Sequence, residues 1–201
     1  MHPIRRFAPF LAAALLFAGE PTPQGLQLAA RFDAMEVEHH WLPGSHVNWQ
    51  TGDPDSWQAG KTHCSAFVAA ACERLGVYIL RPPEHSQVHL ATAQAEWLQR
   101  EGMSHGWEPV ATPFQAQELA NQGQLVVAVF PSPDPARAGH VALVRASAKP
   151  DALIEREGPQ IIQAGGENSS SLDLQTGFRR HPGAWNSAGD NRIRFYVHAL
   201  P

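Results

Sequence analysis

The stretch HCSAFVAAACERL, residues 63–75, predicts a helix that is apolar around nearly all of its first three turns. A helix that is apolar on every side is buried among other elements, so we expect this one in the core. Thr62 is a suitable N-cap and Gly76 a suitable C′ residue, and these limits place Cys64 in the first turn. The fold is therefore expected to form around a buried helix with a cysteine at its N-terminus.

The other predicted elements come in an order that separates helices from strands. Apolar spacing predicts further helices over residues 26–41, 84–102 and 112–123, the last with a capping box of Thr112 and Gln115. Short β-rich runs bounded by turn residues then predict strands over residues 124–130, 140–146, 159–164 and 192–200. Helices followed by consecutive strands predict an α+β fold, in which helices pack on an antiparallel β-sheet.

The N-terminus predicts export. Arg5 and Arg6 precede a charge-free apolar run over residues 7–18, which has the layout of a secretory signal peptide and is short for a membrane span. Residues 19–25 are expected to be a linker, so residues 26–201 would form a single domain. We expect a secreted or periplasmic protein with no stable membrane insertion after the signal is removed. An uncleaved anchor or a simple N-terminal helix is the alternative.

Composition narrows the classes of partner. The chain has 201 residues, of which 43% are hydrophobic and 17% charged, as is usual for globular domains. A net charge of −4 gives no reason to expect a nucleic acid as partner. No feature of the sequence indicates an inhibitor or an immunity protein.

The only two cysteines, Cys64 and Cys72, are eight residues apart. On one helix they would be separated by about 12 Å along the axis, whereas a disulfide needs Cα atoms within about 7 Å. An exported protein would then keep a free thiol in an oxidising compartment, which is expected only where the thiol is used or buried. Cys72 lies in mid-helix among alanines and is expected to be a core residue. Cys64 is either a small buried side chain or a nucleophile.

The position of Cys64 favours the nucleophile. The free N–H groups at a helix N-terminus stabilise a thiolate, and the N–H of Cys64 itself could hold a developing oxyanion. A nearby imidazole would complete the activation, and His140, at the start of a predicted strand, is our candidate. Gln163 near the end of the next strand would orient that imidazole. Glu167 and Asn168 are competing candidates for this third role.

Three segments together resemble a known family. The order of "HCSAFV" (63–68), "GHVALV" (139–144) and a polar residue at the end of the next strand is similar to that of the NlpC/P60 and CHAP-type cysteine peptidases, which are papain-like cell-wall hydrolases. The resemblance covers roughly residues 45–200 and implies a papain-like fold. It implies that Cys64 is the nucleophile, His140 the general base and Gln163 the orienting residue, without metal or cofactor. The implied substrate is an amide bond of peptidoglycan stem peptides, cleaved by an endopeptidase or amidase.

The resemblance also implies a role for the segment before the nucleophile, which often supplies an oxyanion donor in this family. Asn48 is the candidate here, and Trp49 and Trp57 are candidate walls of a substrate groove. Half-buried packing is the alternative for both tryptophans.

Three positions depart from the family pattern. His63 replaces the usual Asp before the cysteine, Ala66 replaces the usual Gly, and Gln163 cannot stabilise an imidazolium as a carboxylate would. These departures motivate a second hypothesis, a catalytically weakened or inactive cell-wall-binding domain of the same fold.

A zinc hydrolase is the third hypothesis. The chain has 11 histidines, and His85 and His89 have the i, i+4 spacing that can bind a metal on a helix. No Glu follows His85 as in the H-E-x-x-H motif, so we expect an exposed helix face and no metal site.

Overall fold

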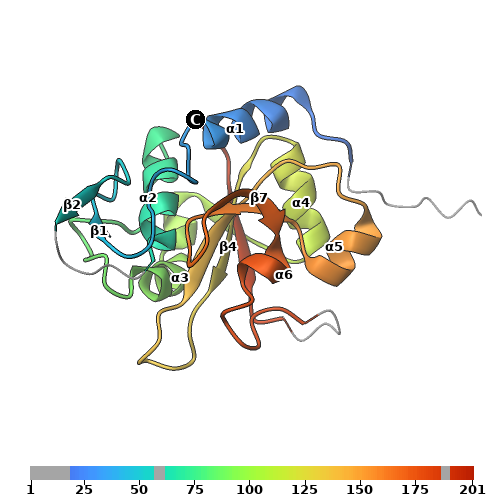
Figure 1. Ribbon diagram of the computed structural model, residues 1–201. Coiled ribbons are helices and arrows are strands. Elements are labelled where there is room, and N and C mark those ends of the chain that lie inside the picture. Colours follow the sequence, from blue (N-terminus) through green and yellow to red (C-terminus); the bar gives the residue numbers. More distant parts are fainter. Residues whose placement is uncertain (1–18, 57–61, 187–190) are drawn as a thin grey trace, which may run out of the picture.

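The computed structural model describes residues 19–56, 62–186 and 191–201 (Figure 1). The predicted signal peptide, residues 1–18, lies outside the described residues. Within them, no helix is both long enough and apolar enough to cross a bilayer.

The centre of the molecule is a six-stranded sheet in which every neighbouring pair is antiparallel. The strand order is β3-β8-β4-β5-β6-β7. The strands are β3 (Trp107–Val110), β4 (Leu125–Phe130), β5 (His140–Val144), β6 (Gln160–Gln163), β7 (Ser169–Asp173) and β8 (Arg194–His198). The sequence predicted β4, β5, β6 and β8 but neither edge strand. β3 contains a proline and β7 begins with three serines, so neither has the apolar run that marks a buried strand.

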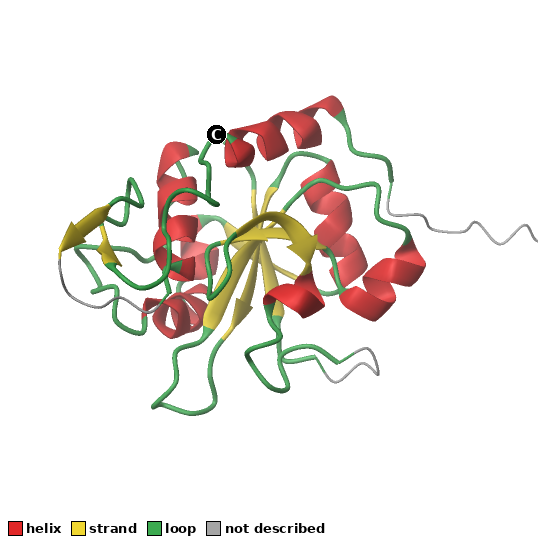
Figure 2. Ribbon diagram, in the orientation of Figure 1, coloured by secondary structure: helices red, strands yellow, loops and turns green. Residues whose placement is uncertain are grey.

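Helices lie on both sides of this sheet (Figure 2). They are α1 (Pro23–Asp33), α2 (Cys64–Arg74), α3 (Leu90–Arg100), α4 (Pro113–Asn121), α5 (Asp151–Glu157) and α6 (Leu174–Gly177), with a 3-10 turn over Gly102–His105. The α+β class is therefore confirmed. The predicted buried helix is α2, of which the first nine residues, Cys64–Cys72, are all buried. The capping box of α4 forms in part, because Thr112 Oγ1 accepts a 3.1 Å hydrogen bond from the N–H of Gln115.

Two predicted helices have different limits. Thr22 caps α1 and Pro23 opens it, so the last three residues of the predicted linker are helical. The same helix ends at Asp33 and not at residue 41, because Glu36 and Trp41 adopt positive φ angles of 50° and 52°.

α3 also begins later than predicted. It starts at Leu90 and not at residue 84, because His89 is left-handed with φ of 55°. His85 and His89 therefore do not share a helix face.

Two apolar clusters hold the layers together. One cluster joins α2 and α3 to one face of the sheet and includes Phe67 and Leu143. The other joins α4 and α6 to the opposite face and includes Val144 and Phe178. A small hairpin of β1 (His46–Val47) and β2 (Pro54–Ser56) precedes α2. These layers fix the N-terminus of α2 against the start of β5.

Candidate active site

Cys64 is the first residue of α2, and the side chain before it leaves the helix end uncapped. His63 occupies the N-cap position, which was predicted for Thr62, and makes no side-chain cap hydrogen bond. Its Nε2 instead lies 2.7 Å from the carbonyl oxygen of Ser45, so His63 donates there. Capping side chains of Thr or Asp are present on α1, α4 and α6. The first-turn N–H groups of α2 are thus free of an N-cap side chain, and they favour negative charge on a group placed beside them.

The thiol of Cys64 lies against the start of β5. Burial raises the pKa of this thiol, and the backbone amides of Val141, Ser65 and Cys64 itself act in the opposite direction. Val141 follows His140 directly, so the structure brings the nucleophile candidate to the strand that carries the base candidate. Only 4% of Cys64 is exposed. Cys72 is also buried and unpaired, as expected from the helix geometry.

His140 and Gln163 form the predicted pair. Their Nε2 and Oε1 atoms are 2.7 Å apart, and both residues are buried. Leu143 pairs with Ile162 across β5 and β6, so side-chain alternation places His140 and Gln163 on the same face of neighbouring strands. An amide oxygen only accepts hydrogen bonds, so the proton of His140 is on Nε2. Nδ1 therefore holds the lone pair that can accept a proton.

Contacts on the far side of Gln163 fix the orientation of its amide. Its Nε2 donates a 3.1 Å hydrogen bond to the carbonyl oxygen of Glu167. Gly177 also packs closely, because a Cβ there would lie 2.8 Å from Oε1 of Gln163. The amide cannot rotate without losing these contacts, so its oxygen stays directed at His140.

The resting site is neutral. Burial lowers the pKa of His140 to about 4, against the opposing effect of its hydrogen bond to Gln163. Burial also raises the pKa of Cys64. Among the hydrogen bonds between described residues, none joins Cys64 to His140. At neutral pH the site therefore holds a thiol and a neutral imidazole.

The two competing candidates for the third role are engaged elsewhere. Glu167 is exposed and its carboxylate forms an ion pair with Arg179 at 2.6 Å. Asn168 donates from Nδ2 to the carbonyl oxygens of Val37 and His40 at 2.7 and 2.9 Å, and it accepts from the N–H of Gly165. Asn168 thus holds two loops together, and of the three candidates the structure brings only Gln163 to His140.

The candidates in the segment before α2 have local roles. Asn48 Oδ1 accepts hydrogen bonds from the N–H groups of Gln50 and Thr51, so this amide closes its own turn and is not directed at Cys64. Trp49 packs against the core cluster of α2, and its carbonyl oxygen accepts a 3.0 Å hydrogen bond from the indole of Trp41. Trp57 lies outside the described residues. Of the oxyanion-donor candidates considered, this leaves the N–H groups of the first turn of α2, which has no side-chain cap.

Sequence reasoning missed the aromatic side chains around His140. Phe178 meets the imidazole edge-on with ring centroids 4.6 Å apart, and His181 stacks on it at 5.1 Å with an interplanar angle of 15°. It also missed Thr92 on α3, whose hydroxyl accepts a 2.9 Å hydrogen bond from the N–H of Gly139. These residues are far from His140 in the sequence, and no local pattern connects them to it.

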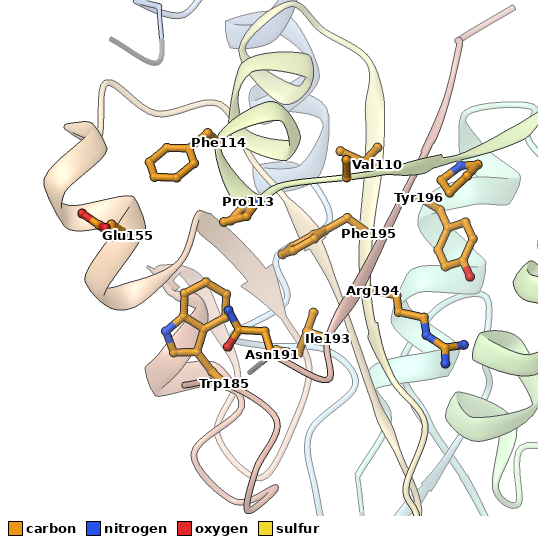
Figure 3. A pocket seen from close by; sticks show the side chains of 12 residues that line it. Val110, Pro113, Phe114, Glu155, Trp185, Asn191, Ile193, Arg194, Phe195 and Tyr196 are labelled. Carbon is orange, nitrogen blue, oxygen red and sulfur yellow. The ribbon is translucent and has the colours of Figure 1, made fainter. Parts of the chain in front are cut away.

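A cavity of about 500 Å³ lies away from these residues, between β3, β8, α4 and α5 (Figure 3). Aromatic side chains form much of its lining, namely Phe114, Trp185, Phe195 and Tyr196. None of its 12 lining residues was predicted as a site residue.

The described residues contain no group of three or more His, Cys, Asp or Glu side chains placed to hold a metal ion. In comparisons with known proteins, no family model matches the chain, and no curated protein matches it significantly.

Proposed function

We propose that this protein is an exported cysteine hydrolase of papain-like fold that cleaves amide bonds, with peptidoglycan stem peptides as the substrate. One observation carries the proposal. Cys64 lies at an uncapped helix N-terminus, against the residue that follows a buried histidine whose tautomer is set by Gln163. The choice of peptidoglycan rests on the sequence resemblance, and export rests on the charge and hydropathy of residues 1–18.

In the proposed mechanism, a proton is transferred as the sulfur attacks. Nδ1 of His140 takes the proton of the Cys64 thiol while Sγ bonds to the carbonyl carbon of the substrate. The first-turn N–H groups of Cys64 and Ser65 stabilise the oxyanion that forms. His140 then gives its proton to the leaving amine nitrogen as the C–N bond breaks. Water, deprotonated by His140, attacks the thioester, and the acid product and the free thiol are released.

The neutral site has a kinetic consequence. A preformed thiolate–imidazolium pair reacts rapidly with alkylating agents, whereas a buried thiol with a raised pKa reacts slowly. Substrate binding must therefore promote the proton transfer. Gln163 can orient the imidazolium formed in that step, but it contributes no negative charge to stabilise it.

A second candidate function has an observation of its own. Cys64 is only 4% exposed and its pKa is raised, which suits a domain that keeps the fold and binds cell wall without cleaving it. Both functions are tested by one experiment, digestion of purified peptidoglycan followed by mass spectrometry of the released muropeptides.

The matched variants are Cys64→Ala and Cys72→Ala. We expect the first to abolish muropeptide release and the second to retain it, because Cys72 is fully buried in the last turn of α2, at the opposite end of the helix from Cys64. We expect prolonged iodoacetamide treatment to inactivate the wild type and EDTA to leave it active. Release by Cys64→Ala would overturn the cysteine mechanism. Sedimentation of the wild type with peptidoglycan, without any release, would establish the binding domain instead.

A further inference from the structure

The side chain of His181 covers one face of the His140 imidazole. The two rings are nearly parallel, at 15°, with centroids 5.1 Å apart. Phe178 meets the same imidazole edge-on at 74°. Gln163 occupies Nε2 at 2.7 Å. His140 is thus held by a stacked ring, an edge-on ring and a hydrogen bond, and only Nδ1 remains for chemistry.

The backbone fixes where His181 lies. It follows α6, and its N–H donates a 2.8 Å hydrogen bond to the carbonyl oxygen of Phe178, while its own carbonyl accepts one from Ala184 at 3.0 Å. Arg137, on the loop that leads into β5, donates to the carbonyl oxygen of Arg180 at 3.4 Å. The loop that carries His181 is therefore attached to the loop that leads to His140.

Within the described residues, we find no polar contact that would give the ring of His181 another role. Among the hydrogen bonds and ion pairs between described residues, none involves its ring nitrogens. Its remaining ring neighbours are Phe130 at 5.7 Å and Phe178 at 6.4 Å. An imidazole whose nitrogens have no such partner is unusual in a half-buried place, since an apolar ring would pack there at lower desolvation cost.

We propose that His181 is a positioning residue for His140, and that its stacked ring keeps one face of the catalytic imidazole dry and fixes the plane in which Nδ1 accepts the proton of Cys64. This inference rests on the proposed hydrolase function, in which His140 is the base.

Electrostatics around the pair agree with the geometry. The charged group that acts on the pair is Arg137, from the loop before β5. Burial, and to a smaller extent the positive charges of His140 and Arg137, lower the pKa of His181 to about 4. Both pKa values lie well below 7, so both rings are neutral at pH 7.

The test compares His181→Ala with His181→Phe in the full chain. The probe is the NMR titration of the His140 ring, which needs no substrate. We expect the alanine variant to admit water to the face of the imidazole and to raise the pKa of His140 by about one pH unit or more, toward its ordinary value near 6.5. We expect the phenylalanine variant, which keeps a stacked ring, to retain a pKa close to that of the wild type.

Activity supplies the second readout. In His181→Ala we expect kcat to fall about tenfold with little change in KM, and the acid limb of the kcat/KM profile to move upward with the pKa of His140. His181→Phe is expected to rescue kcat. His181→Gln, without a ring, takes the place of the alanine variant if that variant does not fold, and it should behave in the same way.

A titration of His140 that is unchanged in a folded His181→Ala or His181→Gln protein would overturn the inference. Its failure is distinguishable from failure of the proposed function. If wild-type protein releases no muropeptides, the function fails, but the NMR titration still shows whether His181 keeps His140 dry.

Discussion

The Nε2–H of His140 donates a 2.7 Å hydrogen bond to Oε1 of Gln163, from one strand to its neighbour inside the protein. This single contact decides the tautomer of the imidazole. It also selects Gln163 from three polar residues that lie within six positions of one another in the sequence.

The first prediction concerns the hydrogen bond between Gln163 and His140. Gln163→Ala removes the acceptor and frees the imidazole to change tautomer, so we expect kcat for muropeptide release to fall about 100-fold. Glu167→Gln is the matched control, because its side chain is exposed in a surface ion pair, and we expect activity within about twofold of the wild type. Steady-state kinetics of both variants measures the difference. Equal losses in the two would contradict the assignment of Gln163.

The second prediction concerns Asn168, whose amide joins the segment around Val37 and His40 to the turn at Gly165. Asn168→Ala removes these hydrogen bonds, so we expect the free energy of unfolding to fall by about 2 kcal/mol. Activity per folded molecule should stay near that of the wild type at low temperature. Urea denaturation followed by tryptophan fluorescence measures the first quantity. A variant of unchanged stability and greatly reduced kcat would instead make Asn168 part of the site.

The third prediction concerns Thr92, which holds the residue before His140. Thr92→Val keeps the size of the side chain but leaves the buried N–H of Gly139 without its acceptor. We expect a loss of about 1–3 kcal/mol in the free energy of unfolding, and a lower kcat because His140 follows directly. Thr92→Ser, which keeps the hydroxyl, is the control, and both its free energy of unfolding and its kcat should be close to those of the wild type. Valine and serine variants with the same stability and kcat would show that this hydrogen bond is unimportant.

The fourth prediction is a pH dependence of stability. The pKa of His140 is about 4 in the folded protein, because burial disfavours its charged form, and near 6.5 in the unfolded chain. Between these values the unfolded chain binds a proton that the folded protein does not, so the free energy of unfolding falls as the pH drops from about 6.5 to about 4. The contribution of His140 is about 3 kcal/mol over this window. His181 acts in the same direction and by less, because it is only half-buried.

Urea denaturation at pH 7.0 and pH 5.0 measures how far the free energy of unfolding falls between the two pH values. In His140→Gln the difference between the two pH values should shrink, because the residue that titrates is gone. His39→Gln, in which an exposed histidine is removed, should keep the wild-type difference. The same difference in His140→Gln as in the wild type would mean that His140 does not titrate as its burial implies.

Local sequence patterns accounted for the central elements. The run of alanines and apolar residues after Cys64 can only be a buried helix, and α2 is buried along its first nine residues. β4 and β5 are apolar enough to be central strands, and both are buried throughout. The spacing of the cysteines excluded a disulfide within α2. Each of these conclusions depends on neighbours within a few residues, and such patterns are visible in one dimension.

The sequence was less informative where non-local contacts decide the structure. Asn48 and Gln163 are both amides, yet one closes a turn and the other binds an imidazole across two strands. Positive φ angles ended α1 early and started α3 late, although the apolar spacing continued. Propensity is a weak guide in such segments, because tertiary contacts override it.

By itself, then, the sequence determined that a cysteine begins a buried helix and that a histidine begins a central strand, because helical and strand periodicity are local. Only the tertiary structure decided that the thiol meets the amide of Val141, that Gln163 and not Asn168 contacts the imidazole, and that His181 stacks on it. Those contacts join residues that are 23 to 131 positions apart in the sequence, and their formation depends on strand register and on how the loops pack.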